Sequence, residues 1–313
     1  MTQAHNMTIA AFGDITFSTH VRLYDDLMLR VAKRLQSKWN KANCVGRKKR
    51  VAAISIWGQA MSAENSVQDQ VSAEEWQVRT DLAACYRIIA MNGWDDLIFT
   101  HISARVPDAD DHFLINPYGM LFEEITASSL VKVDLNGDKV LASPHPVNPA
   151  GFVIHSAIHA ARHDTACVLH THTKAGVAVS TQAEGLLPIS QISLIAIVSL
   201  AYHDYEGIAL NDDEKPRLVA DLGENNAMIL RNHGLLTAGP SVADTYLLMY
   251  ALETACQIQI MAQSSGSDLI HVAQPIVDGI QAQAAHVMKG LGGALAWPGL
   301  LRKLDRQDPS FRD

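Results

Sequence analysis

The chain has 313 residues, 48% of them hydrophobic, and its 25 Lys and Arg against 33 Asp and Glu give a formal net charge of −8. This composition is typical of a globular protein with one large core or two domains, and it excludes a broadly basic surface for nucleic acid. The four cysteines lie far apart without a Cys-x-x-Cys motif, which favours free thiols in a reducing compartment.

Membrane and export signals are weak in this sequence. The longest apolar stretch, near residues 189–201, contains Gln191 and several serines and is too short to span a bilayer. Asp14 interrupts the early apolar run, so no signal peptide is predicted. We therefore expect a cytoplasmic protein with neither a membrane nor a nucleic acid as partner.

Three regions are expected along the chain. Residues 1–70 show weak hydrophobic periodicity and predict a weakly structured N-terminal extension. Met61 begins a segment that could be the natural start, which would make residues 1–60 an upstream addition. The main domain is expected over residues 71–264, followed by a Gly- and Ala-rich peripheral tail over residues 265–313.

The first expected helix of the main domain begins at Ser72. Ser72 and Glu75 have the spacing of a capping box, and apolar residues then repeat at helical intervals until Asn92-Gly93 ends the helix. Asn136-Gly137 predicts a tight hairpin turn. The other expected elements are strands at 98–100, 113–115, 131–135, 139–141, 166–171, 227–230 and 235–238 and helices at 150–162, 174–179, 212–222 and 241–263. Helices mixed with hairpins, without regular alternation of strands and helices, predict an α/β or α+β layered domain.

Three histidines suggest a metal site. His170 and His172 end an apolar strand-like run, and residues i and i+2 of a strand point to the same face. Imidazole is a common ligand of zinc, manganese and iron. His233 follows the next strand-like run in a polar turn, where Gly234 would permit a positive φ, and it could complete a three-ligand site with one open position.

The same pattern has a plainer interpretation. With 14 histidines in the chain, chance placement gives roughly 0.6 His-x-His pairs, so the pair could be solvated or hydrogen-bonded histidines at a strand end. His155 and His159 lie four residues apart on one expected helical face, a second arrangement that can bind metal.

Several short motifs between Ser72 and Gln263 occur in an order that matches a known family. The motifs are Gly93-Trp94, His101-Ile102-Ser103-Ala104-Arg105, Asn116-Pro117-Tyr118-Gly119, His155 with Ala161-Arg162-His163-Asp164, His170-Thr171-His172, and Arg231-Asn232-His233-Gly234-Leu235-Leu236. With them, the chain resembles the class II aldolase/adducin family.

The resemblance implies an α/β fold, an αβα sandwich around a mostly antiparallel central sheet, usually assembled as a homotetramer with active sites between subunits. It also implies one divalent metal ion per chain, most often zinc with manganese or iron as alternatives, held by His170, His172 and His233.

The chain departs from the sugar-phosphate aldolases of that family. Their metal-binding and acid/base glutamate corresponds to Gly151, and the two serines before it correspond to Pro149 and Ala150. The Gly-Asn of their phosphate loop corresponds to Thr100-His101. Because phosphate binding needs clustered N–H, hydroxyl or cationic donors, a sugar-phosphate substrate is not expected.

A catalytic proton carrier must then come from other residues. His101, Tyr118 and Glu123 are the candidates, with His155 as a further one. Each could instead be structural: a hydrogen-bonded histidine, a packed aromatic ring or a solvated turn residue.

Four residues are candidates for substrate binding. Ser103 and Arg105 could orient a carboxylate, since arginine suits planar two-point contacts, although Arg105 could equally hold the strand edge. Asn116 and Gly119 are the other two candidates, and they belong to a turn that is one of the motifs carrying the resemblance.

These observations predict a metal-dependent lyase that breaks a carbon–carbon bond by retro-aldol cleavage or decarboxylation. The substrate would be a small, non-phosphorylated hydroxy- or keto-acid or an aromatic carbonyl compound. The alternatives are a non-catalytic, adducin-like binding protein and a non-haem iron oxygenase of the same fold.

Overall fold

The computed structural model describes residues 66–208, 212–288 and 292–313. The expectations about the N-terminal extension and about a start at Met61 fall on residues 1–65, outside the described residues. Within the described part, no helix is long and apolar enough to cross a membrane.

A seven-stranded sheet forms the centre of the fold, in the order β3-β2-β1-β4-β7-β6-β5. Its pairs are antiparallel except for β5 and β6, which run parallel. The strands are β1 (His101–Arg105), β2 (His112–Ile115), β3 (Val131–Asp134), β4 (Cys167–Thr171), β5 (Leu200–His203), β6 (Ala227–Leu230) and β7 (Gly234–Gly239).

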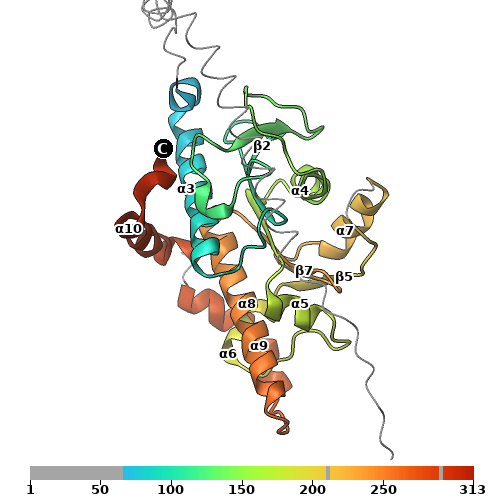
Figure 1. Cartoon of the computed structure of the whole chain (residues 1–313). Helices are drawn as coiled ribbons and strands as arrows, with labels where there is room; N and C mark the ends of the chain where they lie inside the picture. Colours follow the sequence, from blue (N-terminus) through green and yellow to red (C-terminus); the bar gives the residue numbers. More distant parts are fainter. Residues whose placement is uncertain (1–65, 209–211, 289–291) are drawn as a thin grey trace, which may run out of the picture. The chain divides into compact units, whose positions relative to one another are not determined.

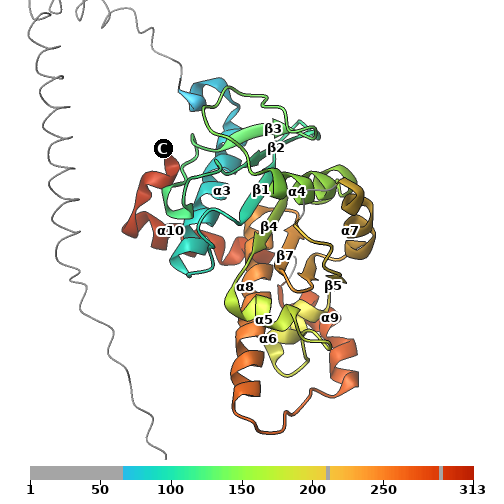
Figure 2. The same cartoon turned by 45° about the vertical axis from the view of Figure 1, so that its right-hand side comes forward.

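Helices cover both faces of this sheet, as Figures 1 and 2 show. The helices are α3 (Ala73–Met91), α4 (Pro149–Ala161), α5 (Lys174–Ser180), α6 (Gln191–Ile197), α7 (Lys215–Leu222), α8 (Val242–Ser264), α9 (Gln274–Met288) and α10 (Trp297–Gln307). Helices α3, α5, α8 and α10 lie on one side, and α4 and α7 pack together on the other. The predicted αβα sandwich around a mostly antiparallel sheet is confirmed.

Strand β4 shows how the sequence builds two layers. Cys167 and Leu169 belong to the large core under α3 and α8, whereas Val168 belongs to the smaller core under α4 and α7. All five residues of β4 are buried because the strand lies between two others and both of its faces are covered. His170 therefore faces the same layer as Val168, towards α4.

Helix α3 begins as predicted, but only half of the expected capping box forms. The Ser72 hydroxyl accepts a hydrogen bond from the Glu75 amide at 3.1 Å. The Glu75 carboxylate instead accepts hydrogen bonds from Arg79 at 2.9 Å and Lys132 at 2.8 Å. A buried guanidinium needs a charged partner, and this pairing outweighs the local cap.

Two strand predictions near β1 and β3 need correction. Residues 98–100 form a turn instead of a strand, and the strand begins at His101. Residues 139–141 contribute only a single bridge, between Lys139 and Val133. Residues 98–100 resemble a strand in sequence because they are mostly apolar. In the structure, however, Phe99 is half exposed and Leu97 has a φ of 51°, which a strand does not allow.

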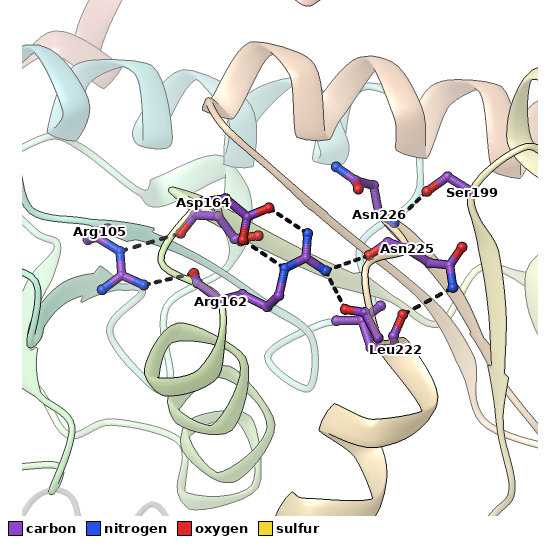
Figure 3. A network of polar contacts seen from close by, with 9 residues as sticks. Arg105, Arg162, Asp164, Ser199, Leu222, Asn225 and Asn226 are labelled. Carbon is purple, nitrogen blue, oxygen red and sulfur yellow. Dashed lines mark hydrogen bonds and ion pairs between the residues drawn. The ribbon is translucent and has the colours of Figure 1, made fainter. Parts of the chain in front are cut away.

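Helices α4 and α7 are tied together by the network in Figure 3. Arg162 donates to the carbonyls of Gly223 at 2.7 Å and Asn225 at 2.9 Å, just beyond the end of α7. The same guanidinium forms an ion pair with Asp164 at 2.7 Å. This arginine therefore fixes the ends of the two helices that cover the α4 face of the sheet.

The C-terminal segment, expected to be a peripheral tail, instead closes the large core. Trp297, Leu304 and Phe311 are buried in the cluster formed by α3 and α8. Beyond α10, the Ala127 amide donates to the Phe311 carbonyl at 3.0 Å, which attaches this segment to the connection between β2 and β3. The Gly- and Ala-rich composition concealed three large apolar side chains spaced along this segment.

We expect Phe311→Ala to destabilise the fold by about 3–5 kcal/mol, because it would leave a cavity at a fully buried ring. Arg312→Ala is the matched control, since Arg312 pairs with Asp305 on the surface and should contribute under about 1 kcal/mol. Urea denaturation measures both changes, and equal small effects would contradict a structural role for the C-terminal segment.

Candidate active site

The three predicted ligands come together at one end of the sheet. His170 is the fourth residue of β4, His172 follows the strand, and His233 lies in the turn between β6 and β7. One nitrogen of each ring lies within 4.8 Å of the others. The ring centroids of His170 and His233 are 4.7 Å apart, and those of His172 and His233 are 4.9 Å apart.

Hydrogen bonds fix how these rings present their nitrogens. Nδ1 of His170 donates to the Leu235 carbonyl at 2.9 Å, and Nδ1 of His172 donates to the Asp96 carboxylate at 3.0 Å. A carbonyl or carboxylate oxygen can only accept, so both protons lie on Nδ1. The two Nε2 atoms lie 2.9 Å apart and present their lone pairs to the same point. This donor set fits a divalent metal.

Burial keeps two of the three metal-binding candidates, His170 and His233, neutral. It lowers the pKa of His170 well below the usual range, with a further contribution from the neighbouring His233 and His172. Burial also lowers the pKa of His233 to about 4, again helped by His172. A neutral imidazole has a lone pair for a metal ion, so these rings are prepared to bind one at neutral pH.

The turn that carries His233 differs in detail from the prediction. The positive φ, 57°, belongs to Asn232, and Gly234 is needed for another reason. A Cβ at Gly234 would collide with the Thr171 carbonyl oxygen and approach His172 to 3.2 Å. The glycine thus lets β7 start close enough to β4 for His233 to reach the other two histidines.

A pocket of about 520 Å³ opens above the three histidines. This volume lies within the range of small-molecule sites. The other residues that line it are Asp96, Phe99, His101, Tyr118, Asn148, Pro149, Ile154, Tyr205, Gly207 and Ile208.

His101 occupies the space that a side chain at position 151 would need. A Cβ added to Gly151 would lie 2.7 Å from Cγ and 2.8 Å from Nε2 of the His101 ring. His101 is the β1 residue paired with His170 of β4, and their ring centroids are 5.1 Å apart. The glycine and the histidine are therefore one packing unit: the first provides the room that the second fills.

A chain of buried hydrogen bonds continues behind His101. Its Nδ1 lies 2.8 Å from Nε2 of His155, whose Nδ1 lies 2.5 Å from the Ser103 hydroxyl. That hydroxyl also lies 2.7 Å from Nε2 of His159. Burial lowers the pKa of His101 and His155 well below the usual range and that of His159 to about 3, so all three rings are neutral at pH 7.

Comparison with known proteins assigns the family. The family described as Class II Aldolase and Adducin N-terminal domain matches residues 80–260. A Pseudomonas aeruginosa protein named "Putative aldolase class 2 protein" is 62% identical over 249 residues, which cover 79% of this chain and 96% of that protein. The chain belongs to the class II aldolase and adducin N-terminal domain family.

Other relatives of this family member carry two kinds of name. Alpha-adducin of Rattus norvegicus is 46% identical over 203 residues, which cover 63% of this chain but 28% of alpha-adducin. An aldolase II superfamily protein from Pseudomonas syringae has a TM-score of 0.75 at 54% identity, covering 79% of this chain and 100% of its own. L-fuculose 1-phosphate aldolase from Glaciozyma antarctica PI12 has a TM-score of 0.65 at 28% identity. The match covers 77% of this chain and 94% of that aldolase.

Among the candidate proton carriers of this family member, two line the pocket. His101 and Tyr118 face it, whereas Glu123 is exposed in the short helix η2 (Phe122–Glu124), which packs against α3. The fold thus brings His101 and Tyr118 to the three metal-binding candidates and leaves Glu123 outside the pocket lining.

The four substrate-binding candidates lie outside the lining of the pocket. Ser103 is buried in the chain behind His101, and Asn116 accepts a hydrogen bond from the Tyr86 hydroxyl at 2.9 Å. Gly119 is exposed, with a φ of 104° that suits the predicted turn.

Arg105, the fourth candidate, closes the end of α4 (Figure 3). Its guanidinium donates to the carbonyls of His159 at 2.6 Å and Arg162 at 3.2 Å. Cations stabilise the negative end of a helix in this way. The structure therefore favours the alternative in which this arginine holds the fold.

Two further residues of the site carried no signal in the sequence. Asp96 orients His172, and the ring centroid of Tyr205 lies 6.3 Å from that of His233. Asp96 follows the Gly93-Trp94 motif by two residues, but no spacing rule connects it with His172. Both contacts are created only when distant loops meet.

We expect Gly151→Ala to destabilise the protein by about 1–3 kcal/mol, because the new methyl group collides with the His101 ring. Helix propensity alone would predict a gain of about 0.5–1 kcal/mol, so the sign is diagnostic. In the Gly151→Ala, His101→Ala double variant the collision disappears. Urea denaturation of the wild type, the two single variants and the double variant gives the coupling energy between positions 101 and 151. If the two changes in the free energy of unfolding are additive, the two residues do not pack as a unit.

The buried histidines also predict a dependence of stability on pH. Unfolded histidines titrate near pH 6.5, whereas folded His159 titrates at about 3. Between these values the unfolded chain binds the extra proton, so the free energy of unfolding falls as pH decreases from 6.5 towards 3. We expect His159→Gln to reduce this slope by about 1.4 kcal/mol per pH unit, and the exposed His163→Gln to leave it unchanged. Parallel curves for the wild type and His159→Gln would contradict the assignment.

Proposed function

We propose that this protein is a metal-dependent lyase that cleaves a carbon–carbon bond in a small, non-phosphorylated substrate, either a hydroxy- or keto-acid or an aromatic carbonyl compound. The observation that carries the proposal is the convergence of His170, His172 and His233 at the floor of a pocket of about 520 Å³. The names of the aldolase relatives agree with it.

The metal would be held by the three histidines. Zinc is the first candidate, with manganese or iron as alternatives, at one ion per chain. Bound there, a divalent ion supplies Lewis-acid chemistry, polarising a carbonyl oxygen and stabilising negative charge that develops on it. Asp96 and the Leu235 carbonyl keep two of the rings oriented for this role.

His101 is the proposed proton carrier. It lines the pocket, and its Nδ1 is occupied by His155, which leaves Nε2 for the substrate. In a retro-aldol cleavage Nε2 takes the proton of the β-hydroxyl as the carbon–carbon bond breaks. The carbon that keeps the electron pair is then protonated, and the products are two carbonyl compounds. Tyr118 is the second proposed acid on the same wall.

The chain behind His101 supports both directions of this transfer. Each neutral imidazole has one donor and one acceptor nitrogen, and the Ser103 hydroxyl can donate or accept. When Nε2 of His101 takes a proton from the substrate, Nδ1 can share its own proton with His155, and the added proton stays on the chain because Nδ1 of His159, at its far end, has no hydrogen-bond partner among the described residues. The same proton is then available for return to the substrate. His155 and Ser103 are thus proposed as positioning residues.

The second candidate is a non-catalytic binding protein, which the 46% identity to alpha-adducin favours. An iron oxygenase of the same fold is the third. We propose a homotetramer for the enzyme, following the family resemblance. Metal content separates the candidates: iron favours the oxygenase, zinc or manganese favours the lyase, and a protein that binds no metal favours the adducin-like function.

We expect about one metal ion per chain in the untagged protein and none in His170→Ala, measured by elemental mass spectrometry. Asp96→Asn should keep the site but weaken metal affinity by about 10–100-fold, measured by chelator competition. His163→Ala is the control, because His163 is exposed and outside the pocket lining. Full metal content in His170→Ala would refute the ligand assignment.

A further inference from the structure

The pocket mouth is apolar and open. Phe99, Tyr205 and Ile208 line it, and they are 50%, 53% and 74% exposed. They come from two loops, the turn before β1 and the segment after β5, which meet beside the three histidines. Large apolar side chains exposed together around a polar centre indicate a ligand with an apolar part.

Among the described residues, no lysine or arginine lines this pocket. Three cations of β1 and α7 have other partners: Arg105 holds the end of α4, Lys215 pairs with Asp212, and Arg217 pairs with Glu206. An anionic group far from the metal would therefore find no charged partner there.

The N-terminus of α4, another source of anion binding, contributes little to this pocket. At the N-terminus of α4 the lining residue is Pro149, which has no N–H to donate. The lining carboxylate, Asp96, already accepts from His172 and would repel an anion. A phosphate would exchange its hydration for neutral donors, such as the hydroxyls of Tyr118 and Tyr205, without a lysine or arginine on the described lining.

We propose that the substrate carries a neutral aromatic or branched apolar group next to its metal-chelating oxygens. The proposal rests on the proposed metal-dependent function and selects between its two substrate classes. The chelating oxygens lie at the three histidines, and the apolar group packs between Phe99 and Tyr205. Because the Tyr205 ring centroid lies 6.3 Å from that of His233, a ring one carbon away from the chelating group reaches it.

Three hydroxamates test the proposal, because a hydroxamate chelates metal through two adjacent oxygens. Acetohydroxamate, phenylacetohydroxamate and a hydroxamate with a terminal phosphate are titrated calorimetrically into the zinc-loaded protein. We expect phenylacetohydroxamate to bind at least about tenfold more tightly than acetohydroxamate, because binding removes the apolar surface of its phenyl ring from water. The phosphate compound should bind no more tightly than acetohydroxamate.

Tyr205→Ser should reduce the preference for the phenyl compound to about threefold or less and leave the affinity for acetohydroxamate unchanged. Tyr250→Ser is the matched control, because Tyr250 is similarly exposed at 44% but lies beside Trp94, with ring centroids 6.1 Å apart, outside the pocket lining. This comparison separates the pocket wall from any general effect of removing a surface tyrosine.

Two results would overturn the proposal. One is tighter binding of the phosphate compound than of the phenyl compound by protein that contains zinc. The other is an unchanged phenyl preference in Tyr205→Ser together with a smaller assembly by light scattering, which would assign this apolar surface to contact with a second copy. Absence of zinc after reconstitution would instead refute the metal-dependent function itself.

Discussion

The pairing of β4 with β1 on one side and β7 on the other is the constraint on which the site depends. The register places His101 directly opposite His170, and it sets Thr171 opposite Leu235. Because side chains alternate along a strand, this register turns both histidines towards α4. A shift of one residue would bury them in the opposite core. The strand pairing alone thus places His101 and His170 side by side, and the loops add the other residues of the site.

The layer between the sheet and α4 has an unusual electrostatic character. It contains several imidazoles that are almost fully buried and neutral, joined through one serine hydroxyl. Burying a neutral, hydrogen-bonded ring costs much less than burying a charge. The layer therefore contains polar groups able to exchange protons, although its side chains are shielded from solvent. Gly151 is the small residue that makes this packing possible, because any side chain there would displace His101.

The family includes proteins named as aldolases and proteins named as adducins, and this chain is close to both. Its histidine cluster is a complete donor set, which is the feature that favours the aldolase side. Its pocket walls, however, are apolar, and Arg105 is used to hold α4. In our proposal, the chain combines a three-histidine group that could hold a metal ion with walls suited to a less polar ligand than a sugar phosphate.

The sequence by itself determined the fold class, most helices and the three metal-binding candidates. These depend on local periodicity and on a strand end with histidines at i and i+2, which are short-range patterns. The tertiary structure decided the partners: Asp96 for His172, the fit of His101 into Gly151, and the burial of Phe311 in the core. Each joins residues far apart in the chain, and such contacts follow from sheet register and packing, which no local pattern encodes.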